Sequence, residues 1–184
     1  MPELPEVETV VRELNRKLKG RIISAVSVRA PKMVAVGPKT LPNIRTASAS
    51  AARKFANIMA SQKILSVKRR AKLLIFDFKG PLSLMAHLKM TGQFIFEDSY
   101  LRKKSAGRYR ILNKLTAPLV ALPGKHTHVI FNFTDGAKLY FNDLRRFGYL
   151  KLVRDDQVAQ VPELQNYGPE PLDKNLQRKF LQRG

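Results

Sequence analysis

The hydrophobic positions near the N-terminus recur with the period of an α-helix. The apolar residues that would form one face of a helix over residues 3–18 are Leu4, Val7, Val10, Val11, Leu14 and Leu18. Glu3 and Glu6 favour the positive end of the helix dipole, and Gly20 is a natural stop. The pattern therefore predicts an amphipathic N-terminal helix that packs one face against a core.

The remaining pattern is mostly that of strands. After a predicted strand over residues 21–28 and a loop over 31–42, a short helix rich in small residues is predicted for residues 47–60. Short apolar runs separated by turn signals then cover residues 64–67, 73–78, 82–90, 94–96, 127–133, 138–141 and 149–153. This order predicts an α+β, mostly β fold, namely a β-sandwich with the N-terminal helix and a second flanking helix outside.

Two stretches break the pattern. Residues 100–125 contain many Lys and Arg and no acidic residue, which predicts a long basic loop. Such a loop is either a solvated face or a contact for phosphates. The segment 167–184 starts with a Pro- and Gly-rich turn and continues with a helical pattern through Leu176 and Phe180.

The charge balance narrows the choice of partner. Lys and Arg number 34 against 14 Asp and Glu, for a net charge of +20 and a pI near 10.6. A field of this size favours a polyanion, most often a nucleic acid, although a ribosomal-type structural protein or a membrane-surface binder would share it. The absence of cysteine excludes disulfides and cysteine-based zinc sites within this chain. No apolar run is long enough to span a membrane, and the acidic, proline-broken start is unlike a signal peptide, so we expect a cytoplasmic protein.

The N-terminus is a candidate nucleophile. Removal of Met1 would leave the secondary amine of Pro2, and an α-amino group has a pKa near 8 against about 10.4 for lysine. Attack of such an amine on a sugar carbon would give an iminium ion able to drive elimination of phosphates. Glu3 and Glu6 could supply the proton that breaking a glycosidic bond requires. The alternatives are that Pro2 suits a helix edge and that both carboxylates stabilise the helix start.

Six motifs in order along the chain resemble one known family. They are PELPEVETV at the N-terminus, KRRAKLLIF around Lys72, HLKMTG at 87–92, KHTHV at 125–129, DLRRFG at 143–148 and GPEPL at 168–172. Together they resemble formamidopyrimidine-DNA glycosylase, the bacterial oxidised-purine glycosylase and abasic-site lyase. The leucine of PELPE resembles this enzyme more than its pyrimidine-lesion sister, endonuclease VIII.

The resemblance implies a role for each matching catalytic residue. Pro2 would form the Schiff base with the sugar, Glu3 would be the general acid and proton shuttle, and Glu6 would support it. Lys72 would act in catalysis and contact a phosphate, and its charge would lower the pKa of the Pro2 amine. His87 is interpreted as structural, and no metal site is expected in this chain.

The resemblance also implies a DNA-binding set. His126 and Arg145 would contact the DNA backbone and the gap left by the base. Met90, Arg145 and Phe147 would fill the hole left when the damaged base is flipped out, because an apolar wedge recovers part of the unstacking cost. Met90 and Phe147 sit at the ends of predicted strands, where an apolar side chain would be exposed, although core packing is the ordinary alternative for each. His128 is interpreted as structural.

The sequence departs from the family in its second half. Full-length members continue with a helix–two-turn–helix module and a zinc finger made of cysteines, so we expect a catalytic domain over residues 1–166 and a linker with the first helix of a truncated module over 167–184. A fragment of a longer protein is favoured over a genuine short form. The structural zinc of the family would lie in the missing finger, and no cofactor is expected here.

The leading hypothesis is a monomeric base-excision enzyme that acts on double-stranded DNA containing oxidised purines or abasic sites. The enzyme would remove 8-oxoguanine or formamidopyrimidine and then cleave the strand by β,δ-elimination. A catalytically weak or inactive DNA-binding remnant is the first alternative. A small-molecule tautomerase that uses Pro2 as a base is the second, and the high positive charge argues against it.

Overall fold

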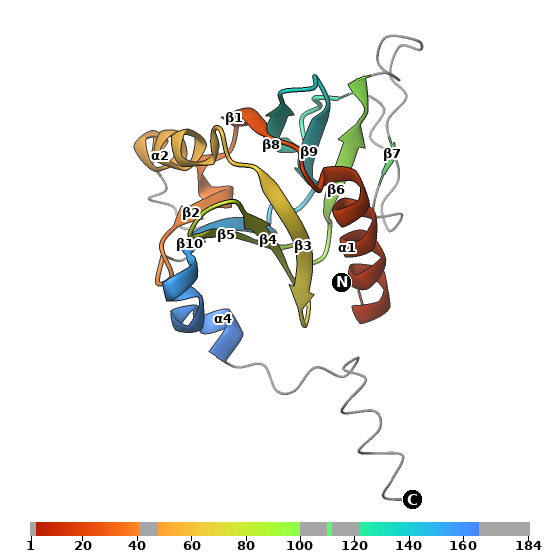
Figure 1. Cartoon of the computed structure of the whole chain (residues 1–184). Helices are drawn as coiled ribbons and strands as arrows, with labels where there is room; N and C mark the ends of the chain where they lie inside the picture. The colour runs from red at the N-terminus through yellow and green to blue at the C-terminus, as the bar shows by residue number, and fades with distance from the viewer. Residues whose placement is uncertain (1–2, 41–47, 100–109, 112–121, 166–184) are drawn as a thin grey trace, which may run out of the picture.

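Two five-stranded sheets form the body of the protein (Figure 1). A computed structural model describes residues 3–40, 48–99, 110–111 and 122–165. In spatial order, the first sheet contains β1 (Ile23–Val28), β8 (Thr127–Phe133), β9 (Lys138–Asp143), β6 (Gly92–Glu97) and β7 (Arg110–Ile111). The second contains β2 (Val34–Val36), β10 (Tyr149–Arg154), β5 (Leu82–His87), β4 (Leu73–Phe78) and β3 (Ile64–Arg70). The strand pairs are antiparallel except for β2 and β10, which are parallel.

The two sheets share one apolar core. The ring of Phe76 on β4 lies edge-on to Phe94 on β6, with 5.6 Å between ring centroids. Phe94 also lies 5.2 Å from Phe141 on the neighbouring strand β9. Aromatic pairs at these separations contribute beyond the area that they bury. The predicted β-sandwich and its α+β, mostly β class are confirmed.

Two helices flank the sandwich, as predicted. Helix α1 (Leu4–Leu18) packs against β3, and its Lys17 ammonium lies 5.7 Å from the ring of Phe96 on β6. Helix α2 (Ala49–Met59) packs against β1 and β2, at the other side of the sandwich (Figure 1). The side chain of Ser48 accepts a hydrogen bond from the backbone N–H of Ala51 and so caps α2.

The predicted loop over residues 31–42 is wrong in its first half. Residues Pro31–Met33 form the 3-10 helix η1, and Val34–Val36 form β2. This strand pairs with β10, which lies more than a hundred residues further along the chain. Its three residues therefore form their interstrand hydrogen bonds only in the folded protein. Such a short run has no local signal that separates it from a loop.

The predicted basic loop over 100–125 contains a strand that the sequence did not indicate. Strand β7 pairs with β6 at the edge of the first sheet, while residues 100–109 and 112–121 lie outside the described residues. Strand β5 ends at His87 rather than at Met90, which leaves residues 88–91 as a loop. The segment 167–184 also lies outside the described part of the chain.

A second, smaller core covers the outer face of the second sheet. It joins Leu73, Met85 and Val153 to Val161, which follows the 3-10 helix η2 (Asp155–Gln160) and precedes α4 (Pro162–Gln165). Beside it the ammonium of Lys151, whose side chain is fully buried, donates to both carboxylate oxygens of Glu163 at 2.6 and 2.9 Å. None of the helices in the described part of the chain is long and apolar enough to cross a membrane.

Candidate nucleic-acid interface

Strand register brings the candidate residues from separate motifs to one end of the sandwich. His87, at the end of β5, is opposite both Leu73 at the start of β4 and Tyr149 at the start of β10. Gly92, at the start of β6, is opposite Asp143 at the end of β9. The turn that carries Lys72, the loop over 88–91 and the loop over 144–148 therefore share this end. His126 joins them, because its carbonyl accepts a hydrogen bond from the N–H of Asp143 at 3.0 Å.

Helix α1 points its first turn toward the same end. Arg69 on β3 donates to the Glu8 carboxylate at 2.6 Å, and the N–H of Val67 donates to the Asn15 side chain at 2.9 Å. The helix thus runs antiparallel to β3, and its N-terminal residues lie beyond Arg69, on the side of the turn that contains Lys72. Pro2 itself lies outside the described residues.

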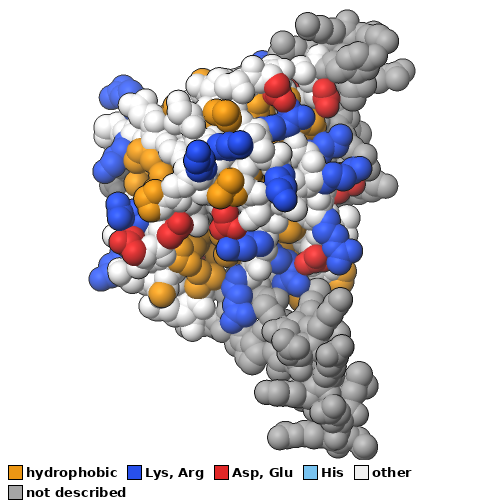
Figure 2. Space-filling view, viewed as in Figure 1, with side chains coloured by type: hydrophobic (Ala, Val, Ile, Leu, Met, Phe, Trp, Pro, Cys, Tyr) orange, Lys and Arg blue, Asp and Glu red, His pale blue; other side chains and the backbone are white. Residues whose placement is uncertain are grey.

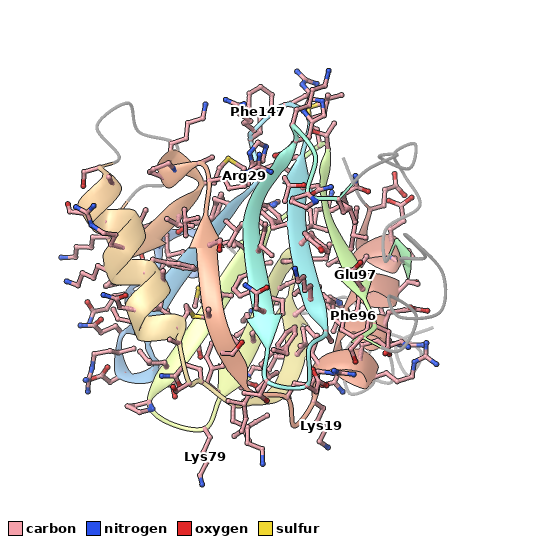
Figure 3. All side chains as sticks on the ribbon, turned by 90° about the horizontal axis from the view of Figure 1, so that it is seen from above. Lys19, Arg29, Lys79, Phe96, Glu97 and Phe147 are labelled. Carbon is pink, nitrogen blue, oxygen red and sulfur yellow. The ribbon has the colours of Figure 1, made fainter. Side chains whose placement is uncertain are left out.

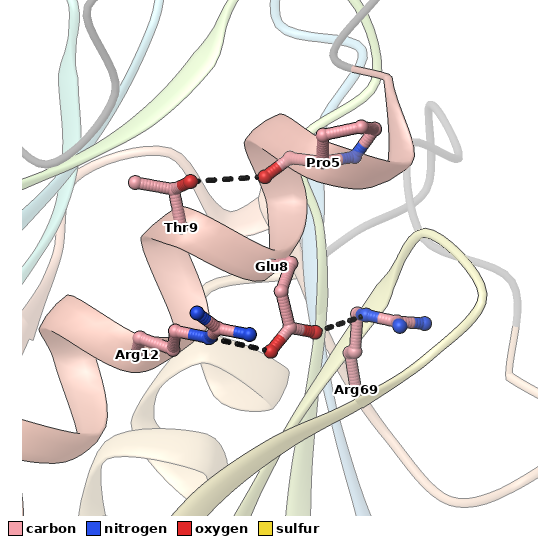
Figure 4. Close-up of polar contacts among 5 residues, drawn as sticks. All are labelled: Pro5, Glu8, Thr9, Arg12 and Arg69. Carbon is pink, nitrogen blue, oxygen red and sulfur yellow. Dashed lines mark hydrogen bonds and ion pairs between the residues drawn. The ribbon is translucent and has the colours of Figure 1, made fainter. Parts of the chain in front are cut away.

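Glu8 fixes this arrangement with two arginines (Figure 4). Burial disfavours its charged form, but hydrogen bonds from Arg69 and Arg12 outweigh that effect and hold the pKa of Glu8 below its usual value. The Arg69 side chain is only 8% exposed, against 78% for Arg12. The buried Arg69 contact is therefore the one that ties the helix to the hairpin.

The two candidate carboxylates of α1 differ in their surroundings. The Glu6 side chain accepts a hydrogen bond from the backbone N–H of Glu3 at 2.8 Å, so Glu6 stabilises the start of the helix. Glu3 is exposed at this end of the sandwich. Together the two residues form a capping box, in which the Glu3 side chain accepts from the backbone N–H of Glu6. Both catalytic roles stay predictions, and the alternative that the two carboxylates stabilise the helix start has contacts behind it.

Two loops build an exposed cluster that we call the tip cluster, made of Met90, Arg145 and Phe147. The guanidinium of Arg145 donates to the Met90 sulfur at 3.1 Å and lies 4.8 Å from the ring centroid of Phe147. Met90 is 45% and Phe147 47% exposed, so the core-packing alternative is wrong for both. Figure 3 places Phe147 at the end of the molecule opposite Lys19 and Lys79.

Leu144, the most exposed large apolar residue described, was not among the predicted site residues. It precedes Arg145 in the same loop and is 60% exposed. An isolated apolar residue is ordinary on a protein surface, so its type gave no signal. Its place next to a run of charged residues at a loop tip was the feature that could have marked it.

The two histidines interpreted as structural are buried. Burial first, and then the charge of Lys89, lower the pKa of His87 to about 4, and its Nδ1 accepts a hydrogen bond from the N–H of Lys89 at 3.0 Å. Burial also lowers the pKa of His128, so the neutral ring donates from Nε2 to the carbonyl of Asp143 at 2.7 Å. The same carbonyl contact partly opposes that shift.

Further cationic residues lie at the same end of the molecule as the tip cluster. Lys89 precedes Met90, and Arg146 precedes Phe147. Arg29, which Figure 3 also places at this end, donates to the carbonyl of Gly124 at 2.8 Å. Blue Lys and Arg side chains are also spread over the face that Figure 2 shows, with orange apolar side chains between them. Among the residues that the structure describes, no group of three or more His, Cys, Asp or Glu side chains could hold a metal ion.

The site is thus an exposed apolar tip with a guanidinium between two apolar side chains, in a protein of net charge +20, a combination found among proteins that bind nucleic acids. The sequence matches the family described as formamidopyrimidine-DNA glycosylase N-terminal domain over residues 1–150. The chain therefore belongs to the formamidopyrimidine-DNA glycosylase family.

Individual relatives agree with this assignment. The chain is 38% identical to the formamidopyrimidine-DNA glycosylase of Pediococcus pentosaceus over 98% of its own length and 54% of the relative. It is 35% identical to that of Azorhizobium caulinodans, again over 98% of the chain and 54% of the relative. A crystal structure of the Lactococcus lactis Fpg with DNA containing an abasic site superposes with a TM-score of 0.67 at 28% identity, covering 99% of this chain and 57% of the other. The chain thus spans about half the length of the relatives it matches.

Proposed function

We propose that this chain is the catalytic half of a base-excision DNA glycosylase and abasic-site lyase that acts on oxidised purines in double-stranded DNA. Family membership supports the class of reaction. The observation that carries the proposal for this chain is the exposed tip cluster. It lies at the same end of the sandwich as the N-terminal turn of α1. The net charge of +20 supports a phosphate backbone as the partner.

In the proposed reaction, the secondary amine of Pro2 attacks C1′ of the damaged nucleotide and a new C–N bond forms. The bond from C1′ to the base breaks, and the departing base takes a proton. Glu3, which is exposed, would act as the general acid and proton shuttle: it gives a proton to the departing base and takes up the proton that the attached amine loses. It then gives this proton to O4′ as the C1′–O4′ bond breaks and the amine becomes an iminium. The resulting iminium is an electron sink, so loss of a proton from C2′ expels the 3′ phosphate and a second elimination expels the 5′ phosphate.

The remaining residues would hold the DNA. Lys72 and His126, both partly buried at the same end, are proposed to contact phosphates, and Arg145 to contact the gap in the duplex. Met90 and Phe147 would enter the space that the flipped nucleotide leaves. The division into a domain over 1–166 and a linker with a helix over 167–184, the monomeric state and a cytoplasmic location belong to the same proposal.

Borohydride trapping tests the nucleophile. DNA with an abasic site should become covalently bound to the chain when borohydride reduces the imine. A cleavable extension before Pro2 should abolish trapping, and its removal should restore it, because only a free terminal amine can form the imine. Trapping that persists with the extension in place would move the nucleophile to a lysine such as Lys72.

Glu3→Gln tests the general acid. The substitution keeps size and polarity but removes the exchangeable proton, so excision of 8-oxoguanine should fall by about 10²–10⁴-fold. Reaction at a pre-formed abasic site is the control, and it should suffer less because the base has already left. An equal loss on both substrates would make Glu3 a part of the helix start only.

A DNA-binding module without catalytic activity is the competing function, and the net charge of +20 supports it equally. It predicts salt-sensitive binding to duplex DNA without trapping and without strand cleavage. Wild-type chain that binds DNA but gives no covalent adduct under borohydride would select this alternative.

A further inference from the structure

The buried carboxylate of Asp143 joins the two loops that carry the tip cluster. One of its oxygens accepts hydrogen bonds from the Thr91 hydroxyl and from the backbone N–H of Arg145, the latter at 3.1 Å. The other accepts from the N–H of Gly148 at 2.7 Å. Asp143 has no exposed surface. Its three donors come from the loop after β5 and from both sides of Phe147.

Thr91 closes the arrangement from the opposite loop. Its hydroxyl oxygen also accepts the N–H of Arg145 at 3.1 Å, so the two loops share one donor. The neutral ring of His128 donates a hydrogen bond to the backbone carbonyl of Asp143. We call this set of contacts, made by Thr91, His128, Asp143 and the N–H groups of Arg145 and Gly148, the Asp143 junction.

Gly148 is required for this close approach. A Cβ atom on Gly148 would lie 3.0 Å from the Asp143 carboxylate and 2.9 Å from the His87 carbonyl. Both loops also carry a non-glycine residue with left-handed backbone directly before a tip residue. Lys89 precedes Met90 with φ 52°, and Arg146 precedes Phe147 with φ 57°. Such conformations are unfavourable for residues with a side chain and persist only when surrounding contacts impose them.

We propose that Asp143 and Thr91 are positioning residues that set the tip cluster at the spacing needed to enter DNA, a role that rests on the proposed function. Neither side chain has to touch DNA for this. The junction fixes the backbone on both sides of Phe147 and ties it to the loop of Met90, so the two apolar side chains keep one separation around the Arg145 guanidinium. Wedge and nucleophile must act one nucleotide apart, and a misplacement of about 1 Å can cost about a hundredfold in rate.

A matched pair of substitutions at Thr91 tests the junction. Thr91→Val removes the hydroxyl and keeps the shape, whereas Thr91→Ser keeps the hydroxyl. Excision of 8-oxoguanine from duplex DNA in single turnovers should fall about 10–100-fold in Thr91→Val and in Asp143→Asn. Thr91→Ser should stay within about twofold of wild type, because the hydrogen bond that matters is retained.

Borohydride trapping on a single-stranded abasic oligonucleotide separates positioning from general damage. That substrate has no stacked duplex to enter, so trapping should stay within about threefold of wild type in all three variants. Equal effects of Thr91→Val and Thr91→Ser on duplex excision would overturn the proposal. An equal loss on single-stranded DNA would also overturn it, since the junction would then serve only the fold.

Amide hydrogen exchange tests whether the junction holds the loop, and it does not depend on activity. A wild-type chain that neither excises nor traps would refute the proposed function, not the junction. In Thr91→Val and Asp143→Asn the N–H groups of Arg145 and Gly148 should exchange at least about tenfold faster, while the amides of β8 and β9 keep their protection. Unchanged exchange at both amides would show that the junction does not hold the loop.

Discussion

Apolar side chains are usually buried and charged ones exposed, and two regions of this protein depart from this rule in opposite ways. At the tip, Met90, Leu144 and Phe147 expose apolar surface. On the outer face of the second sheet, the side chain of Lys151 is fully buried. The buried charge is satisfied inside the chain, because Glu163 accepts hydrogen bonds from Lys151 and from the hydroxyl of Tyr149, the latter at 2.9 Å.

The contrast is between a buried charge that the fold satisfies and exposed apolar side chains that the fold does not cover. Burial disfavours the charged form of Glu163, but the hydrogen bond from Lys151 and further hydrogen bonds outweigh this and lower its pKa. The pair thus fastens α4 to β10 without any partner. Exposed apolar side chains at a loop tip contribute little to the folded state, which is compatible with the proposed role of Met90 and Phe147 as a wedge.

The largest expected effect breaks the buried pair. Lys151→Met keeps the length of the side chain but leaves the Glu163 carboxylate without its ammonium, which should lower the free energy of unfolding by about 3 kcal/mol. The double variant Lys151→Met with Glu163→Leu should regain most of that loss, because no buried charge remains unpaired. Urea denaturation measures both. A double variant that is no more stable than the single one would mean that the pair adds stability beyond mutual neutralisation.

The next effect concerns the pH dependence of stability near the tip. His87 has a pKa of about 4 in the folded protein against 6.5 when unfolded, so the unfolded chain binds more protons between these values. The free energy of unfolding should therefore fall as pH drops from 6.5 toward 4, by about 3 kcal/mol for this residue.

His87→Asn is the control for that measurement, since its side-chain oxygen can accept the N–H of Lys89 but does not titrate. The variant should show a shallower loss of stability in the same window, read from thermal melts at several pH values. An identical slope in both proteins would assign the pH dependence to other groups, such as His128, whose pKa is also lowered.

The smallest expected effect sharpens the comparison from the exposed side. Phe147→Ala should change the free energy of unfolding by about 1 kcal/mol or less, because the ring is half exposed. Phe94→Ala, the same substitution at a fully buried position, should cost about 3–5 kcal/mol. Similar losses from the two variants in urea would show that Phe147 is part of the core and would remove the main support for a wedge.

Local pattern was sufficient for most of the elements. Helix α1 covers residues 4–18 of the predicted 3–18, because its apolar positions repeat with the helical period and a capping carboxylate precedes them. The hairpin of β8 and β9 was predicted from its turn residues. Strands β2 and β7 were missed, since each is two or three residues long and exists only through pairing with a distant strand.

The sequence by itself determined which residues are candidates for the site and that the surface is strongly cationic, because motif identity and charge are properties of composition and order. Only the tertiary structure decided how they meet. Strand register brings residues 72, 90, 126 and 145–147 to one end of the sandwich. The packing of the two sheets leaves Phe147 exposed and Lys151 buried. Thr91 and Asp143 both lie in motifs that the sequence revealed. Their spacing along the chain does not show that both accept the N–H of Arg145. That contact exists only because β6 pairs with β9, about fifty residues further along the chain.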